Sequence, residues 1–564
     1  MYTRQDYERS AQPLMQQPGD FSAWEFYLGN TAQWGDYPVF SHVGREHMRS
    51  QFIRDVEALA VFFKNELKLQ PQDCFTIFMP TNVEGLIAFF ALNKIGVIVN
   101  FIHPLLSSDK VSAIMDFTGS KGVMLLDLFV PGNLDLLKKK GVPAVIVNPK
   151  QYAYPDCIMC PREEKTAAML ADAGVENYGW SETVAKYAGQ SVENIPHGMK
   201  YVCVYMNGGG TTGESRTIML SNSAINNQVY MLGSPDVPTK PERVGVDTEI
   251  CAMPFFHAFG LCAGGLSAIN LGHKGIFLSK FDAETFVKLM KENYVCEFNG
   301  VPNMYKKLVA TPSFDCDALA NVEKMYSGGD LVSQELCDQM YALLRKHGSK
   351  AEFCAGYGLT ECCAACVVNP LWKNKFGTIG MPLPGLRVEI WDDNKNKLPY
   401  NTVGEIVISG PIVMDGYLTE TKEKDVGVYI DDEGVRWVLT GDLGKMDEDS
   451  YITFIGRKKR VIIISGYNVY PVDIERLVEP LPFVKECCAV QGFEGESPII
   501  RLFIVPSEAD GERPAQDTYI RSLIAEKLNR FSVPRDIRYI DALPRTKLEK
   551  IDFMSLSEFE PKKS

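Results

Sequence analysis

Short apolar runs that are typical of buried strands alternate with helix-length segments through most of this 564-residue chain. CFTIFM at residues 74–79 precedes VEGLIAFFALNKIG at 83–96, and VGVDTEICAMPF at 244–255 precedes a Gly-rich apolar segment. Residues 86–102 read as a buried helix followed by a strand. Such alternation favours stacked α/β layers, and the length allows about two to four structural units.

The texture of the chain changes near residue 376. Short strand-like runs punctuated by Gly, Pro and Asp follow, which predicts a β-rich subdomain over about 376–456. The last hundred or so residues have the pattern of a separate α+β unit, and the charged stretch GRKKR at 456–460 suits a linker. We therefore expect an N-terminal domain over 1–456 and a C-terminal domain over 457–564.

Charge and composition exclude several classes of protein. The formal net charge of -13 argues against a nucleic-acid partner, because such binding needs clustered Lys and Arg. No apolar stretch reaches the roughly 20 residues of a membrane span, and no secretory signal is visible, so we expect a cytoplasmic protein. Most of the 15 cysteines sit singly in apolar runs, which favours reduced thiols.

Two cysteine pairs have the spacing C-x-x-C. Cys157 and Cys160 lie in a Pro-flanked loop, and Cys363 and Cys366 lie in the apolar run ECCAACVVNP. Together they offer four thiolates for zinc. Their wide separation and the apolar surroundings of the second pair favour plain buried side chains instead.

The clearest local signal is a glycine and threonine cluster, YMNGGGTTGESR at residues 205–216, beside the strand-like run KYVCVYM. Glycines let successive backbone N–H groups converge on an anion, and Thr211 and Thr212 add hydroxyl donors. The cluster predicts a phosphate-binding loop. From the pattern alone, a plain glycine turn remains an equal alternative.

Two known phosphate fingerprints fit this cluster incompletely. G-x-G-x-x-G spans Gly208 to Gly213, but residues 217–220 intervene before a helix capped at Ser221 or Ser223, whereas a dinucleotide-binding helix opens within its glycines. The spacing of a Walker loop also fits residues 208–215. There, however, Glu214 occupies the lysine position and would repel the phosphates.

Eight further motifs follow in order along most of the chain: PFFHAFG at 254–260, NGVP at 299–302, SGGD at 327–330, GYGLTE at 356–361, TGD at 440–442, GRKK at 456–459, GYNVYP at 466–471 and PRTKLEK at 544–550. With the glycine loop, they resemble the adenylate-forming superfamily of acyl-CoA synthetases, firefly luciferase and nonribosomal peptide adenylation domains. The resemblance implies an α/β AMP-binding domain with a β-rich subdomain, and a small mobile C-terminal α+β lid.

The resemblance also implies an ATP site. Tyr357 would stack on the adenine, while Asp442 accepts hydrogen bonds from the ribose hydroxyls and Arg457 donates to them. Taken singly, each of these two charges is better explained as an ordinary surface residue. The ATP-binding residues carried over from the family are Gly209, Gly210, Thr211, Thr212, Gly213, Arg216, Gly329, Asp330, Tyr357, Asp442, Arg457 and Lys459.

In this interpretation Lys550 is the central catalytic residue. When a carboxylate attacks the α-phosphate, negative charge concentrates on both groups, and an ammonium on a flexible stem can bridge them. Its structural alternative is an ordinary solvated lysine. Glu361 beside Thr360 offers hard oxygen ligands for Mg²⁺. The resemblance places His257, otherwise a core histidine, near the acyl carboxylate and the thiol tunnel.

The remaining site assignments also come from the resemblance. Gly466 would line the approach of the thiol after the lid turns. The acyl pocket would be formed by Asn299, Gly300, Val301 and Gly356.

The chain departs from the family pattern at six positions. Arg216 replaces lysine and keeps the positive charge, and Glu549 replaces the glycine before Lys550, which leaves the local turn there open. The other departures are Gly209 for serine, Ser215 for proline, Arg460 at the hinge position and Ile463 where lysine is common.

These patterns predict an ATP-dependent acyl-CoA ligase. The motifs are most similar to those of fatty-acyl-CoA synthetases, so we expect an apolar carboxylic acid, such as a fatty acid, as substrate. This acid and MgATP would give acyl-AMP and pyrophosphate, and coenzyme A would then accept the acyl group. One alternative loads a separate carrier protein. Rivals of other classes are a dinucleotide oxidoreductase built on Gly208–Gly213 and a catalytically inactive binding module.

Overall fold

The computed structural model describes residues 17–42, 45–148, 163–208, 216–233, 241–420, 425–464, 467–495, 497–507, 513–545 and 551–557. The chain forms two compact units. The larger comprises Met1–Val388 and Ile408–Val438, and the smaller comprises Glu389–Val407 and Leu439–Ser564. The predicted α/β fold, with a large N-terminal and a small C-terminal domain, is confirmed.

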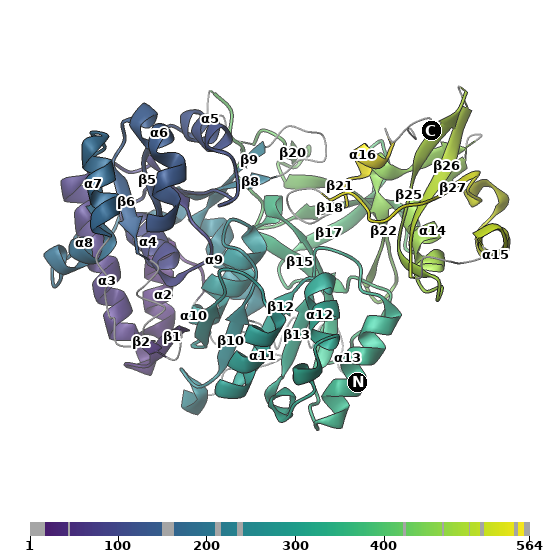
Figure 1. The fold of residues 1–564 in the computed structure, drawn as a ribbon, viewed down its shortest axis with the longest axis horizontal. Helices are drawn as coiled ribbons and strands as arrows, with labels where there is room; N and C mark the ends of the chain where they lie inside the picture. Colours follow the sequence, from purple (N-terminus) through teal and green to yellow (C-terminus); the bar gives the residue numbers. More distant parts are fainter. Residues whose placement is uncertain are drawn as a thin grey trace. The chain divides into compact units, whose positions relative to one another are not determined.

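An eight-stranded sheet lies at one side of the large unit (Figure 1). Its order is β19-β9-β8-β4-β3-β5-β6-β7, and the strands from β8 to β7 are parallel, whereas β9 and β19 run antiparallel to their neighbours. The bounds are β3 Cys74–Phe78, β4 Ile98–Phe101, β5 Ser120–Leu126, β6 Ala144–Val147, β7 Asn177–Gly179, β8 Val202–Gly208, β9 Arg216–Ser221 and β19 Gly416–Tyr417.

A nine-stranded sheet forms the second layer, in the order β16-β15-β14-β13-β12-β10-β11-β1-β2. The strands from β14 to β1 are parallel, while β15, β16 and β2 are antiparallel additions at the edges. The bounds are β1 Pro38–His42, β2 Arg45–Met48, β10 Thr248–Cys251, β11 Lys274–Phe277, β12 Val295–Gly300, β13 Lys324–Ser327, β14 Glu352–Leu359, β15 Ala364–Val368 and β16 Met381–Pro382.

Successive strand residues point to opposite faces of a sheet, so both faces of each sheet carry apolar side chains. Helices cover both of these faces. In β3, Phe75 and Ile77 join the central core, and Phe78 joins the outer one. Central helices are α2 (Ala23–Thr31), α3 (Arg49–Val61), α4 (Val83–Lys94), α8 (Trp180–Tyr187), α9 (Asn222–Leu232) and α10 (Ser267–Asn270). Outer helices are α5 (Ser108–Thr118), α6 (Val130–Lys140) and α7 (Glu164–Asp172) on one sheet, and α11 (Ala283–Glu292), α12 (Pro302–Val309) and α13 (Gln334–Lys346) on the other.

Several local predictions are confirmed. The buried segment at 86–102 is the end of α4 followed by β4, and Asn82 caps α4 by accepting a hydrogen bond from the Gly85 amide. Ser221 caps α9, as one of the two expected positions. Because α9 begins only after the complete strand β9, the helix placement required by a dinucleotide fingerprint is missing from these residues. No helix in the described segments is long and apolar enough to cross a membrane.

The β-rich texture after residue 376 is also confirmed. A five-stranded sheet has the order β17-β18-β21-β20, with β22 pairing β21. Its strands are β17 Arg387–Trp391, β18 Gly404–Ser409, β20 Tyr429–Ile430, β21 Arg436–Met446 and β22 Ile452–Arg457.

The C-terminal residues form the expected α+β unit around the sheet β25-β26-β27. One face packs on α14 and α15, and the other packs on α16. The elements are β23 Ile462–Ile464, β24 Tyr467–Val469, α14 Pro471–Val478, β25 Val484–Glu494, β26 Ser497–Pro506, α15 Arg513–Lys527, β27 Asp536–Tyr539 and α16 Phe553–Ser557.

Tyr305 on α12 fastens two neighbouring strands of the nine-stranded sheet. Its buried hydroxyl lies 3.1 Å from the carbonyl oxygen of Phe298 on β12 and 2.9 Å from that of Tyr326 on β13. We predict that Tyr305→Phe lowers the free energy of unfolding by about 1–2 kcal/mol, because buried carbonyls lose a donor. Tyr294→Phe, at a half-exposed tyrosine of the same unit, should change it by less than about 0.5 kcal/mol. Urea unfolding measures both, and equal midpoints would contradict the fastening role.

Candidate active site

Four predicted motifs of the large unit lie at the carboxyl ends of four neighbouring parallel strands. Cys251 of β10 pairs with Asn299 of β12. Beyond them, Ser327 of β13 pairs with Gly300 on one side and with Ala355 of β14 on the other. Because parallel strands end at the same edge of a sheet, the segments that follow them lie along one edge. Four of the predicted motifs are brought together there: 254–260, 299–302, 327–330 and 356–361.

Glycines bring three of these segments into contact. The Gly328 amide donates a hydrogen bond of 2.9 Å to the Gly300 carbonyl. A Cβ on Gly328 would lie 3.3 Å from the carbonyl oxygen of Gly356, and one on Gly329 would lie 3.5 Å from Val301. Gly329 also has φ +81°, a conformation that side chains with a Cβ rarely adopt. The chain therefore crosses the strand ends as bare backbone, which exposes N–H and C=O groups to a ligand.

Two predicted adenine-binding residues lie at this edge. Tyr357 is half-buried on β14, where it pairs in register with Val367 of β15. Asp330 is exposed after β13, and its carboxylate accepts a hydrogen bond of 2.8 Å from the Leu331 amide. An aromatic ring, a carboxylate and glycine backbone along one sheet edge suit a purine, which offers both a flat face and polar edges.

His257 stands on a tight turn after β10. Its amide donates to the Pro254 carbonyl at 3.0 Å, and its ring centre lies 4.9 Å from that of Phe256, which in turn contacts His103. A π-helical segment, Phe259–Leu266, begins two residues later. A Cβ on Gly260 would lie 2.1 Å from the Pro254 carbonyl oxygen, so glycine is required for this segment to close on the turn.

Glu361 is fixed by residues far from it in the sequence. It follows β14 in the turn Thr360–Cys362, and its carboxylate accepts a 2.9 Å hydrogen bond from the hydroxyl of Tyr417. The Met414 amide binds its carbonyl oxygen at 2.8 Å. Burial and the charge of Glu361 raise the pKa of Tyr417 to about 12. Tyr417 therefore remains a hydrogen-bond donor to Glu361 throughout the physiological pH range.

Arg216 joins this group from the other sheet. Its guanidinium carbon lies 4.8 Å from the centre of the Tyr417 ring, and β19, which carries Tyr417, pairs with β9, which begins at Arg216. Arg216 and Gly208 are register partners across the hairpin of β8 and β9. Both ends of the glycine loop are thereby anchored beside Tyr417 and, through it, beside Glu361.

Several predicted site residues lie outside the described residues. They are Gly209, Gly210, Thr211, Thr212 and Gly213 of the glycine loop, together with Gly466 and Lys550. Cys157 and Cys160 also fall outside, whereas Cys363 and Cys366 are buried free thiols next to and within β15.

In the small unit, Asp442 and Arg457 face each other on neighbouring strands. They are register partners in β21 and β22, and Arg457 Nε lies 3.4 Å from Asp442 Oδ1. The Asp442 side chain is 7% exposed and that of Arg457 is 49% exposed. Such a pair, with a buried acceptor and a solvent-facing donor, matches the ribose-binding role implied by the resemblance. Lys459 is exposed in the following turn, Lys458–Arg460.

The structure adds residues that the sequence did not single out. Tyr417 is one, since nothing in its local pattern links it to Glu361. Two buried carboxyl groups are others: Asn299 Nδ2 lies 3.2 Å from Glu249 Oε1 and 3.1 Å from Glu297 Oε1. Burial raises the pKa of Glu249 well above its usual value, whereas the pKa of Glu297 is lowered by Lys324 in spite of its burial. The two buried carboxyl groups therefore hold the Asn299 side chain near the carboxyl end of β12.

Solved structures of other proteins share this fold. ATP-bound MatB from Rhodopseudomonas palustris superimposes with a TM-score of 0.76 at 21% identity, covering 95% of this chain and 99% of that one. A benzoate CoA ligase from Burkholderia xenovorans gives a TM-score of 0.76 at 17% identity, covering 95% and 100%. The two-sheet unit with its β-rich and C-terminal additions is thus a fold that this chain shares with both proteins.

The chain belongs to the AMP-binding enzyme family, which matches residues 29–418, and the AMP-binding enzyme C-terminal domain matches residues 473–550. This confirms the resemblance drawn from the motifs. Among curated proteins, a long-chain-fatty-acid–CoA ligase of Bacillus subtilis is 26% identical over 535 residues, which cover 93% of this chain and 91% of that protein.

The glycine at 260 allows a sharp test of the His257 turn. We predict that Gly260→Ala lowers the free energy of unfolding by about 1–3 kcal/mol, because its Cβ would collide with the backbone of 253–254. Gly264→Ala is the control in the same helical segment, since its Cβ would meet Cys251 at an ordinary 3.6 Å. Urea unfolding should show a lower midpoint for Gly260→Ala than for Gly264→Ala, and the reverse order would refute the packing argument.

Proposed function

We propose that this chain is an AMP-forming acyl-CoA ligase that activates a fatty acid. The observation that carries the proposal is the convergence of four predicted motifs at the carboxyl ends of β10, β12, β13 and β14, in a chain of the AMP-binding family. The full-length similarity to a long-chain-fatty-acid–CoA ligase supports the choice of reaction and of acid.

In the first half-reaction, the acid's carboxylate oxygen attacks the α-phosphorus of ATP, and pyrophosphate leaves. Tyr357, Gly329 and Asp330 would bind the adenine, and Asp442 with Arg457 would bind the ribose. The glycine loop and Arg216 would hold the phosphates. Many binding residues are needed because the attacking carboxylate and the leaving pyrophosphate have to be held in line across the α-phosphorus.

Two further groups would stabilise negative charge in this step. Glu361, oriented by the Tyr417 hydroxyl, supplies a hard carboxylate oxygen that fits Mg²⁺, which would neutralise the phosphate oxygens when bound. The ammonium of Lys550 would bridge the carboxylate and the α-phosphate, where negative charge increases in the transition state. Both groups stabilise charge without changing their own covalent state.

In the second half-reaction, the thiolate of coenzyme A attacks the acyl carbon and AMP leaves, so that a thioester forms. We propose that residues 457–564 act as a lid that turns between the steps, and that Gly466 then lines the path of the thiol. His257, on its rigid turn after β10, would lie near the reacting carbonyl. Transfer to a carrier-protein thiol is the alternative outcome of the same chemistry.

The substrate class can be tested directly. Acid-dependent pyrophosphate release would be measured over a panel of saturated acids of increasing length, benzoate and a short dicarboxylate. The proposal expects kcat/KM to rise with chain length and thioester to form with coenzyme A. A preference for benzoate or the dicarboxylate would overturn the fatty-acid assignment but keep the ligase one. Absence of pyrophosphate release with every acid would point to the inactive binding module.

Arg216 should matter through its charge. We predict that Arg216→Lys stays active, while Arg216→Glu raises the KM for ATP about 10- to 150-fold, the value of a charge-assisted hydrogen bond. Lys121→Glu, an exposed position on β5 of the same sheet, makes the same change in net charge and should leave the KM unaltered. If both Glu variants behave alike, Arg216 has no contact with the phosphates.

Lys550 should act in adenylation alone. We predict that Lys550→Ala loses roughly a hundred- to a thousandfold in pyrophosphate exchange, because its charge is needed only as that transition state forms. Its conversion of supplied acyl-AMP and coenzyme A to thioester should persist. Lys547→Ala is the matched control in the same segment, and Gly466→Trp should show the opposite pattern, with exchange kept and thioester lost. Normal exchange by Lys550→Ala would remove the residue from catalysis.

A further inference from the structure

A second group of reactive side chains lies at the opposite edge of the nine-stranded sheet. Asp247 immediately precedes β10, His273 immediately precedes β11, and Cys296 is the second residue of β12. These three strands are adjacent and parallel, in the order β12-β10-β11. The group therefore lies at the amino ends of strands whose carboxyl ends carry the candidate active site, and it is separate from that site.

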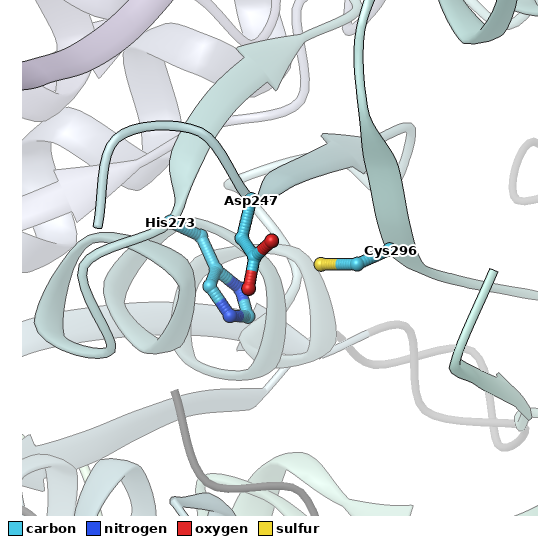
Figure 2. A group of neighbouring side chains, drawn as sticks. All are labelled: Asp247, His273 and Cys296. Atoms are coloured by element: carbon cyan, nitrogen blue, oxygen red, sulfur yellow. The ribbon is translucent and has the colours of Figure 1, made fainter. Parts of the chain in front are cut away.

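The three side chains point toward one another (Figure 2). One carboxylate oxygen, one imidazole nitrogen and the thiol sulfur all lie within 4.8 Å of each other. Each residue is at least nine-tenths buried. Backbone bonds fix the spacing, because the Lys274 amide next to His273 donates to the Asp247 carbonyl at 2.7 Å.

Within the described residues, His273 Nδ1 is buried and has no hydrogen-bond partner. The nearest carboxylate oxygen is Glu249 Oε2 at 3.8 Å, which is too far for a hydrogen bond. The Cys296 thiol makes one weak contact, 3.6 Å from the Thr248 carbonyl oxygen. A buried ring nitrogen without a partner carries a desolvation cost of about 1–3 kcal/mol, which a ligand bound to it would remove.

The charged side chains around the cluster include more carboxyl groups than cations, which favours a bound cation. Arg243 bridges Asp247 and Glu323, and Lys324 Nζ lies 3.6 Å from Glu297 Oε2. Two cations thus face four carboxyl groups, which are Asp247, Glu249, Glu297 and Glu323. Carboxyl groups therefore outnumber the cations that face them, and a cation bound at the cluster would offset this excess.

We propose that Asp247, His273 and Cys296 bind one zinc ion. Oxygen, imidazole nitrogen and thiolate sulfur are the ligand types that zinc takes in proteins, and three protein ligands leave the fourth position for water. At bond lengths of about 2.0–2.3 Å, tetrahedral ligand atoms lie roughly 3.3–3.6 Å apart, so these side chains need to close by only about an ångström.

The neighbouring residues suit this assignment. Arg243 Nε holds Asp247 Oδ1 at 2.5 Å, which orients the carboxylate and leaves Oδ2 for the ion. A second triad, Glu249, His273 and Glu297, overlaps the first, but its carboxylates are already bound by Asn299 and Lys324. As the S–Zn bond forms, the Cys296 thiol releases its proton to solvent. The ion would join the amino ends of three strands.

The experiment is metal analysis of the full chain produced in zinc-supplemented medium and then dialysed against EDTA. We expect about one zinc per chain, and less than about a tenth of that in Cys296→Ala and His273→Gln. Cys251→Ala is the matched control, because Cys251 is a buried thiol on β10 outside the triad. Zinc absent from the wild-type chain, or retained by both ligand variants, overturns the proposal.

Cobalt substitution tests the ligands without relying on the stability of the variants. Refolding with Co²⁺ in place of Zn²⁺ should give the visible absorption of four-coordinate cobalt and a near-ultraviolet thiolate charge-transfer band. Cys251→Ala should keep both features. Refolded Cys296→Ser, whose hydroxyl is nearly the size of the thiol, should lose the charge-transfer band. A band that persists in this variant would place the metal on other cysteines and refute the assignment.

Discussion

The common register of the parallel strands β10, β12, β13 and β14 is the constraint on which the candidate site depends. Hydrogen bonds between neighbouring strands fix their ends to one line, so segments that are far apart in sequence leave the sheet side by side. A slip of one residue in any strand would turn its side chains to the other face and displace its loop. Burial of both faces of the sheet makes such a slip costly.

The same register separates two kinds of chemistry. Carboxyl ends present glycine backbone and exposed polar groups, as expected where ligands bind in α/β sheets. Amino ends hold buried ionisable groups, among them Asp247, His273 and Cys296. Glu249 and Glu297 lie between these edges and contact Asn299. A change in the charge of this buried layer can therefore reach the strand ends through one amide side chain.

Much of the fold could be predicted from the sequence because its signals are local. The helix at 83–94 is expected from its continuous apolar run, whereas the cap at Asn82 and the left-handed backbone of Gly329 are revealed by the structure. The order of the motifs along the chain also allowed the family to be predicted, because eight separate motifs match the same superfamily. The boundary near residue 456, the lid motion and the role of Lys550 remain predictions.

What the sequence could not provide are contacts between distant segments. Tyr417 belongs to a two-residue strand with no periodicity of its own, and its place beside Glu361 depends on pairing with β9 about two hundred residues earlier. Arg460 replaces the usual hinge residue, yet only the structure shows it bound to Glu475 and stacked on Phe553. In both cases the partner is chosen by topology rather than by local propensity.

The pairing of β19 with β9 has a consequence for synthesis on the ribosome. β9 leaves the exit tunnel long before Tyr417 is translated, and at about 5–20 residues per second the wait is roughly 10–40 s. During this interval the seven strands of the sheet that precede β19 present β9 as an open edge, which is a template for association with other chains. Arg216, a charged residue at the first position of that strand, would discourage such encounters until β19 arrives.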